Sequence, residues 1–268
     1  MSVEFFKMTG TGNDFIVVDN RADAVGEDRA AFAARWCVRR TGVGADGVLL
    51  IEPAEGDADF RMRIFNADGS EPEMCGNGAR CAARFACVRG IAPHRMVMQT
   101  LAGPVSAEVG EQKVTIGMGQ VALPEEPVRL DAEGRQWEVH AVESGVPHAI
   151  IFTDDLEGAP VEAVGRAIRR HRHFQPRGTN VDFVRVDGEQ SISVRTYERG
   201  VEAETLACGT GAIGSAVVAH ATGRVSSPPV DVRVPGGALT IDFRSGADRV
   251  TDARLTGDAV FVYEARLL

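Results

Sequence analysis

Lysine is almost missing from this chain of 268 residues. Only Lys7 and Lys113 are present, so arginine carries nearly all of the positive charge. A Schiff-base lysine is what pyridoxal phosphate needs to make an α-proton labile. Lys7 falls in a predicted strand and Lys113 in a predicted hairpin, and neither place favours that role. The shortage of lysine therefore argues against a pyridoxal phosphate enzyme.

The chain also lacks an excess of positive charge and any long apolar run. Lysine and arginine total 29 against 38 aspartates and glutamates, a net charge of −9. Nucleic acids and anionic membranes call for a basic face, so neither is an expected partner. No apolar run approaches the ~20 residues of a membrane span. The first residues show no basic segment before an apolar stretch, so we expect no secretory signal.

Cysteine is present in an odd number, five, and metal-binding patterns are missing. In a chain of this length, that count favours a cytoplasmic protein with thiols over a disulfide scaffold. There is no C-x-x-C, no H-E-x-x-H and no phosphate-binding G-x-x-x-x-G-K. A G-x-G-x-x-G stands at 42–47, but a predicted strand follows it, whereas a dinucleotide site needs the strand before it. We expect neither a metal nor a cofactor.

The sequence contains an internal duplication. Cys75-Gly76-Asn77-Gly78-Ala79 recurs as Cys208-Gly209-Thr210-Gly211-Ala212, which is 133 residues later. Three flanking blocks recur in the same order: Gly12 with 15–18 matches Gly145 with 149–152, 42–48 matches 178–184, and 63–66 matches 195–198. Repeats of this kind indicate two homologous halves. We expect domains at 1–121 and 122–255, with a strand in 256–268 returning to the first.

Both halves have the same predicted element pattern. Turn-bounded apolar runs predict strands at 3–8, 14–19, 47–52, 60–66, 95–100, 104–109, 113–118, 136–142, 148–153, 181–186, 191–197, 230–235, 238–244 and 249–255. Helices are predicted at 28–39, 77–89, 161–171 and 210–222. The second and fourth helices are small and apolar around most of their circumference, which is typical of buried helices. The predicted fold is α+β, with two pseudosymmetric domains, each a mixed sheet around a central helix, and an active site in the cleft between them.

Cys75 and Cys208 each stand immediately before such a buried helix. The first backbone N–H groups of a helix lack intrahelical partners and attract an anion. A thiol there can have its pKa lowered from ~8.5 to ~3.5–7.5, which makes it a usable base. Two matched thiols suit a racemase, in which one group removes an α-proton and another returns it on the opposite face. For Cys37, Cys81 and Cys87, with apolar neighbours, we expect packing roles.

Asparagine is scarce, yet four of the five asparagines lie in the duplicated blocks: Asn13, Asn66, Asn77 and Asn180. Asparagine in glycine-rich segments often serves turns. Together with Glu198 and Arg199, at the position matching Asn66, these residues look more like the polar lining of a pocket. Arg199 suits a second carboxylate and Glu198 an ammonium. His148 begins a strand whose counterpart carries Asn13, and it could tune a nearby thiol.

The motifs resemble those of the diaminopimelate epimerase family. The matching segments span essentially the whole chain: Phe6-Lys7-Met8-x-Gly10-x-Gly12-Asn13-Asp14-Phe15, Phe65 to Ser70, Met74 to Cys81, Gly178-Thr179-Asn180, Tyr197 to Gly200 and Ala207 to Ala212. The resemblance implies a cofactor-independent epimerase that interconverts L,L- and meso-diaminopimelate for lysine and cell-wall synthesis. It also implies a cytoplasmic homodimer of two pseudosymmetric domains.

The resemblance assigns a role to each candidate residue. Cys75 and Cys208 would be the acid–base pair, and the backbone of Gly76, Asn77, Gly209 and Thr210 would hold the reacting carboxylate. Binding of the substrate, mainly its distal end, would fall to Asn13, Asn66, Asn180, Glu198 and Arg199. His148 and Glu198 would modulate a thiol pKa.

Two positions depart from the family pattern, and three other readings stay open. Gly47 stands where a glutamine can bind substrate, and Val146 stands where an asparagine is common, and the loss of that asparagine removes one distal contact. The nearest alternative is a sibling racemase for proline or histidine, which need not share Asn66, Asn180 and Arg199. The others are a thiol redox protein that cycles a Cys75–Cys208 disulfide, and a non-catalytic amino-acid-binding module.

Overall fold

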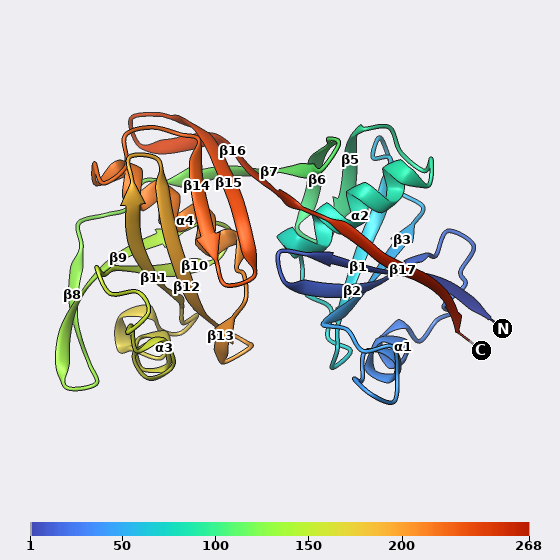
Figure 1. Ribbon diagram of the computed structural model, residues 1–268, viewed down its shortest axis with the longest axis horizontal. Coiled ribbons are helices and arrows are strands. Elements are labelled where there is room, and N and C mark those ends of the chain that lie inside the picture. Colours follow the sequence, from blue (N-terminus) through green and yellow to red (C-terminus); the bar gives the residue numbers. More distant parts are fainter. Residues whose placement is uncertain (1, 268) are drawn as a thin grey trace. The chain divides into compact units, whose positions relative to one another are not determined.

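The computed structural model describes residues 2–267, which form two compact units (Figure 1). The first runs to Gly117 and includes the described residues from Thr256 onward, and the second is Met118–Leu255. This division is one of packing. The domain limits 1–121, 122–255 and 256–268 stay a prediction. Among the described residues, no helix is long and apolar enough to cross a membrane.

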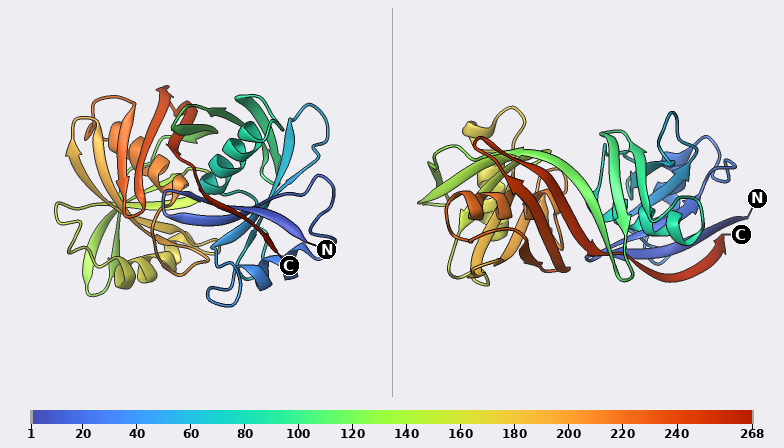
Figure 2. Two further views of the ribbon diagram at one scale, coloured as in Figure 1. Left: turned by 45° about the vertical axis from the view of Figure 1, so that its right-hand side comes forward. Right: turned by 90° about the horizontal axis from the view of Figure 1, so that it is seen from above.

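The first unit holds two α-helices and most of the N-terminal strands. Its helices are α1 (Arg29–Trp36) and α2 (Gly76–Val88). Its strands are β1 (Val3–Gly10), β2 (Asn13–Asp19), β3 (Gly47–Glu52), β4 (Phe60–Asn66), β5 (Arg95–Thr100), β6 (Gly103–Val109) and β17 (Val260–Leu267). Figure 2 shows β17 running beside β1, with Val3 opposite Leu267. Strands β7 (Lys113–Ala122) and β16 (Arg249–Asp258) run across the division between the units.

The second unit holds the other helices. These are α3 (Val161–Arg169), the short 3-10 helix η1 (Arg172–Phe174) and α4 (Gly209–Ala221). Its strands are β8 (Val128–Ala132), β9 (Arg135–Glu143), β10 (Pro147–Phe152), β11 (Asn180–Gly188), β12 (Ser191–Glu198), β13 (Ala203–Thr205), β14 (Val230–Val234) and β15 (Gly237–Ser245).

The two units repeat one strand topology. In the first, β1–β2 is antiparallel, β2–β3 parallel, β3–β4 antiparallel, β4–β5 parallel and β5–β6 antiparallel. In the second, β9–β10, β10–β11, β11–β12, β12–β14 and β14–β15 follow the same alternation. A matched ion pair supports the equivalence: Arg63 binds Glu71 through two hydrogen bonds, as Arg195 binds Glu204. The duplication read from sequence is therefore a duplication of fold.

Each unit encloses one apolar helix. Helix α2 contacts β1, β2, β3, β4 and β6, and α4 contacts β9 to β12, β14 and β15 (Figure 1). Residues 77–83 of α2 and 211–219 of α4 are all buried. Gly90 and Gly223 follow the helix ends with φ of 67° and 68°, the left-handed conformation that ends a helix most easily with glycine. The predicted fold class, pseudosymmetric halves with a sheet around a central helix, is confirmed.

Strands β8 and β13 and the 3-10 helix η1 were not predicted. Strand β8 pairs with β9 through a two-residue turn in which Glu133 and Gly134 both have positive φ, as a type I′ hairpin turn requires. Glutamate is an unusual residue for the first of those positions, so the turn signal at 133–134 is weak. The three residues of β13 are too few to show any periodicity. Helix α3 ends at Arg169, two residues before its predicted end at 171, and η1 begins at Arg172.

Candidate active site

Cys75 occupies the residue before helix α2. Its backbone is extended, with φ −141° and ψ 119°, and helical geometry begins at Gly76. Gly78, in the first turn of the helix, packs on side chains of β3 and β4, and an added Cβ would lie 3.0 Å from Leu49 Cδ2. The sheet thus fixes the start of the helix, and with it the place of the Cys75 thiol.

A row of amide side chains lies beside this helix start. Asn13 donates to Asp46 Oδ2 over 3.0 Å and accepts from Asn77 Nδ2 over 2.5 Å. Asn77 in turn accepts from Arg80 Nη2 over 2.8 Å. We call Asp46, Asn13 and Asn77 the Asp46 chain. It ends two residues beyond Cys75, and each amide has its orientation fixed by a partner at both ends.

Arg80 anchors this chain although it is completely buried in α2. Its guanidinium also donates to the Thr11 hydroxyl over 2.7 Å and to the carbonyls of Asp258 and Gly76 over 3.1 and 3.3 Å. Burial lowers the pKa of the guanidinium. These bonds tie the β1–β2 turn and the segment before β17 to the start of α2.

Asn66 lies at the end of β4, opposite Gly47 of β3. Its side chain is exposed and donates to the Ser70 hydroxyl over 2.9 Å. At Gly47, an added Cβ would lie 2.7 Å from the Phe65 carbonyl oxygen. A side chain at position 47 therefore requires a backbone shift, and Gly47 itself offers no side chain to a substrate.

Cys208 is the counterpart of Cys75 at the start of α4. Its backbone is extended, with φ −118° and ψ 110°, and only 8% of the residue is exposed. The Gly211 N–H donates to Cys208 Sγ over 3.4 Å, and the Thr210 hydroxyl lies 3.4 Å from the same sulfur. The first turn of the helix therefore wraps the thiol.

A hydrogen-bonded row leads from this thiol into the sheet. Thr210 Oγ1 lies 2.9 Å from His148 Nε2, and His148 Nδ1 lies 2.6 Å from Asp182 Oδ2. We call Asp182, His148, Thr210 and Cys208 the Asp182 chain. Asp182 Oδ1 accepts from the Thr196 hydroxyl over 2.7 Å. The His148 and Asp182 side chains are fully buried, so their bond is shielded from water.

Asn180, Arg199 and Glu198 border the Asp182 chain. Asn180 Nδ2 lies 3.3 Å from His148 Nε2, and Asn180 Oδ1 accepts from the Arg199 backbone N–H over 2.7 Å. The Arg199 guanidinium donates to the Arg177 carbonyl over 3.1 Å. The structure thus gathers the predicted site residues into two groups, one in each unit, with Asn66 at the edge of the first.

Buried charges set the protonation of the second group. Burial raises the pKa of the Cys208 thiol well above its ordinary value, and the negative charges of Glu198 and Asp182 raise it further. Hydrogen bonds from Thr210 and Gly211 work against this rise. Burial also raises the pKa of the Glu198 carboxyl, although its hydrogen bond with Cys208 opposes the change. Cys208 therefore rests as a thiol.

The other cysteines behave as packing residues. Burial raises the pKa of Cys37 to about 11 and that of Cys81 to about 12, which makes both unreactive. Cys87 is half-buried near the end of α2. The Lys7 ammonium of β1 is held in an ion pair, since it lies 2.7 Å from Asp14 Oδ2. Among residues 2–267, no three His, Cys, Asp or Glu side chains gather as a metal site would need.

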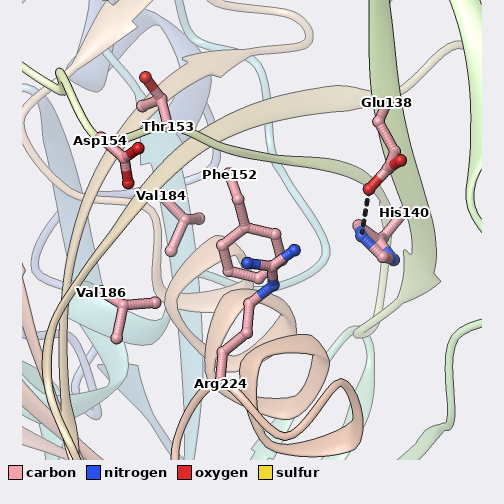
Figure 3. A pocket seen from close by; sticks show the side chains of 8 residues that line it. All are labelled: Glu138, His140, Phe152, Thr153, Asp154, Val184, Val186 and Arg224. Atoms are coloured by element: carbon pink, nitrogen blue, oxygen red, sulfur yellow. Dashed lines mark ion pairs between the residues drawn. The ribbon is translucent and has the colours of Figure 1, made fainter.

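A pocket of about 260 Å³ lies elsewhere in the second unit (Figure 3). Strands β9, β10 and β11 and the segment after α4 line it. The Arg224 guanidinium stands 4.2 Å from the Phe152 ring centroid, and His140 lies beside Glu138, with 3.9 Å between Nε2 and Oε1. None of the predicted site residues lines this pocket.

Two buried residues of the site were missed by sequence reasoning: Asp182 and Thr196. Asp182 lies in the block 178–184, which matches 42–48, but no role in the site was predicted for it. A usable signal was present, because residues two apart on a strand share a face. Asn180 and Asp182 are the polar residues of the buried part of β11, residues 180–184, and they share one face, while β10 places His148 beside Asn180.

Comparison with known proteins gives one consistent answer. The chain matches the diaminopimelate epimerase family over residues 5–124 and 140–262. It is 45% identical to a diaminopimelate epimerase of Aquifex aeolicus, with 99% of this chain and 98% of that protein covered. It is 40% identical to one from Archaeoglobus fulgidus, covering 100% and 97%.

Solved structures share the fold at low identity. A Bacillus anthracis phenazine biosynthesis protein of the PhzF family is 17% identical, with a TM-score of 0.75 over 100% of this chain and 99% of that chain. A probable proline racemase of Agrobacterium radiobacter is 18% identical, with a TM-score of 0.72 over 99% and 93%. From the sequence matches, the chain belongs to the diaminopimelate epimerase family.

Proposed function

We propose that this protein interconverts L,L- and meso-diaminopimelate, a reaction of lysine and cell-wall precursor synthesis. One α-carbon loses its proton and regains one on the opposite face. The observation that carries the proposal is the pair of thiols, Cys75 and Cys208, each at the start of a buried helix in one of two units with the same topology. Family membership names the substrate.

The two thiols divide the proton transfer between them. In each direction, one acts as a thiolate and removes the α-proton, and the other acts as a thiol and supplies the new one. Because the reaction needs them on opposite faces of one carbon, a single cysteine cannot perform both steps. The thiol form of Cys208, favoured by its burial, fits the role of proton donor in the resting enzyme.

The starts of α2 and α4 would hold the reacting carboxylate. The backbone N–H groups of Gly76, Asn77, Gly209 and Thr210 stand in the first turns, where N–H groups have no intrahelical acceptor. Loss of the α-proton moves negative charge onto the carboxylate oxygens. Fixed N–H groups stabilise that charge in the transition state more than in the substrate. The chain's own groups thus suffice for the chemistry without a cofactor or a metal.

The distal end of the substrate, an amino acid itself, needs charged and polar partners. Arg199 suits its carboxylate, since a guanidinium has five donors in a planar fork. Asn13, Asn66 and Asn180 supply amide groups, and Glu198 suits the ammonium. His148 and Glu198 would also adjust the thiol pKa, because His148 is linked to Cys208 through Thr210 and Glu198 bonds the same thiol.

Isomer conversion by cysteine variants tests the function. Wild-type enzyme under reducing conditions should form the meso isomer from L,L-diaminopimelate. Cys75→Ala and Cys208→Ala should each lose at least about 100-fold in turnover, because either loss removes one acid–base group. Cys87→Ala is the matched control and should keep turnover, since that thiol lies near the far end of α2.

Two results would contradict the assignment. Wild-type turnover in either active-cysteine variant would exclude the two-thiol mechanism. Activity on free proline or histidine, with none on diaminopimelate, would select the sibling racemase instead.

We further propose that the enzyme works in the cytoplasm as a homodimer. A reducing compartment keeps thiols available for catalysis. Strand β17 leaves Val260, Val262 and Tyr263 about half exposed, which is an apolar surface that a second copy would cover. Sedimentation should give twice the chain mass, and Val262→Glu should shift it to the monomer. A monomeric wild type would exclude the dimer.

A further inference from the structure

The position of Asn180 fixes the proton on His148. The Arg199 backbone N–H donates to Asn180 Oδ1 over 2.7 Å, which turns the amide nitrogen toward His148 Nε2 at 3.3 Å. An amide nitrogen donates and does not accept. Nε2 must therefore be an acceptor, and the proton of the neutral imidazole stands on Nδ1.

Asp182 receives that proton's hydrogen bond. The Nδ1–H donates to Asp182 Oδ2 over 2.6 Å, while Thr196 holds the other carboxylate oxygen over 2.7 Å. With its carboxylate held from two sides, Asp182 keeps the ring oriented and provides a negative charge beside it.

Thr210 completes a one-way row of donors. Because Nε2 accepts, the Thr210 hydroxyl donates to it over 2.9 Å. The Thr210 oxygen is then left to accept from the Cys208 thiol at 3.4 Å. Every donor in the Asp182 chain therefore points from the thiol toward the carboxylate.

We propose that the Thr210 hydroxyl is a proton bridge between Cys208 and His148, and that Asp182 is the positioning residue that makes His148 a proton acceptor. This inference rests on the proposed function. The S–H proton moves to Thr210 Oγ1 while the hydroxyl proton of Thr210 moves to His148 Nε2. The S–H bond and one O–H bond break, and one O–H bond and one N–H bond form. The products are a thiolate and an imidazolium beside Asp182, with no change in total charge.

The need to ionise Cys208 gives this bridge its use. In the direction in which Cys208 removes the α-proton, it must first become a thiolate in a buried place beside Glu198 and Asp182, where burial and both charges disfavour the ionised form. It must therefore give its own proton to a partner before it can act as a base. The bridge passes that proton to His148 without opening the thiol to water, and the Gly211 N–H stabilises the thiolate.

The Asp46 chain cannot do the same. It holds an aspartate at the matching place, but Asn13 and Asn77 stand where the Asp182 chain has His148 and Thr210. Amide side chains do not take up a proton at ordinary pH, so this chain only positions groups. Of the two chains, only the Asp182 chain can therefore pass a proton.

Thr210 variants test the bridge through rescue by serine. Thr210→Val removes the hydroxyl that carries the Cys208 proton and should lower kcat at least about tenfold. Thr210→Ser restores the hydroxyl and should stay within about threefold of wild type. Both variants keep the backbone N–H that binds the carboxylate. Wild-type kcat in Thr210→Val, or no rescue by serine, would overturn the bridge.

Asp182→Asn tests the positioning residue against Asp46→Asn, its match in the other chain. Asp182→Asn removes the charge that stabilises the imidazolium and should lower kcat at least about tenfold. Asp46→Asn keeps an oxygen acceptor for Asn13 and should lose several-fold less. Equal losses in the two variants would overturn the assigned role of Asp182.

Nitrogen NMR of wild-type enzyme labelled with nitrogen-15 in its histidine rings shows the tautomer of His148 without any turnover. The His148 proton should be on Nδ1, and a proton on Nε2 would overturn the inference. Since this readout needs no substrate, it separates a failure of the proton bridge from a failure of the proposed epimerase activity, which the wild-type isomer assay measures on its own.

Discussion

The Cys75 half and the Cys208 half have the same strand topology and the same helix start, but they differ in the groups behind each thiol. Both place an aspartate, Asp46 or Asp182, behind the helix start. In the first half two amides follow it, and in the second an imidazole and a hydroxyl do. The fold therefore fixes where each thiol stands, and the side chains behind the helix start decide how that thiol exchanges its proton.

A second difference lies within the helices. Arg80 of α2 corresponds to Ile213 of α4, and both are fully buried. The arginine donates hydrogen bonds to Thr11, Asn77 and the carbonyl of Asp258, whereas the isoleucine contributes apolar packing. At this position, buried hydrogen bonds stabilise the Cys75 half, whereas apolar packing stabilises the Cys208 half.

Substitution of Arg80 should give the largest stability effect of this comparison. Arg80→Leu leaves Thr11, Asn77 and Asp258 without a buried donor and should lower the free energy of unfolding by about 3 kcal/mol. Ile213→Leu keeps the volume and should cost less than about 1.5 kcal/mol. Urea unfolding of both variants measures the difference. Equal losses would show that Arg80 acts only as a packing residue.

The matched glycines should respond unequally and less strongly. A Cβ at Gly211 would collide with Asp182 Oδ1, while at Gly78 it would meet the flexible end of Leu49. Gly211→Ala should therefore cost about 2 kcal/mol of stability and reduce kcat with it. Gly78→Ala should stay within about 1 kcal/mol of wild type, because Leu49 can move. Thermal unfolding and an isomer assay test both, and a harmless Gly211→Ala would refute the close approach of Asp182.

Glu198 should give the smallest effect, visible as a pH dependence. Its folded pKa is raised, so its contribution to stability is complete below the ordinary value of 4.5 and is lost as the pH rises through the raised value. Glu198→Gln does not titrate and should gain stability relative to wild type as the pH rises. Unfolding measured from pH 4.5 upward tests this. A constant difference between the two proteins would contradict the raised pKa.

Much of this fold was readable from the residues. The repeated Cys-Gly-x-Gly motif gave both helix starts, and the apolar helices and following glycines gave their burial and their ends. These features are local, so a single stretch of sequence encodes each one. Most of the strands were predictable for the same reason, although β8 was not.

The missed features depend on residues far apart in the chain. Nothing around Arg80 signals that it is buried, because its partners Thr11 and Asp258 lie far away in sequence. Gly211 makes room for Asp182, which also lies far away in sequence. The proton direction in the Asp182 chain follows from an amide that the Arg199 backbone orients, and that contact exists only in the folded protein.

Solvent deuterium during the initial rate tests the central claim most directly. In D₂O, a thiolate that removes a proton from L,L-diaminopimelate holds that same proton, and the other thiol delivers deuterium to the opposite face. The account predicts one deuterium at the inverted α-carbon of the meso product and none in the recovered L,L substrate. Deuterium appearing in the recovered substrate as fast as in the product would contradict two separate thiols.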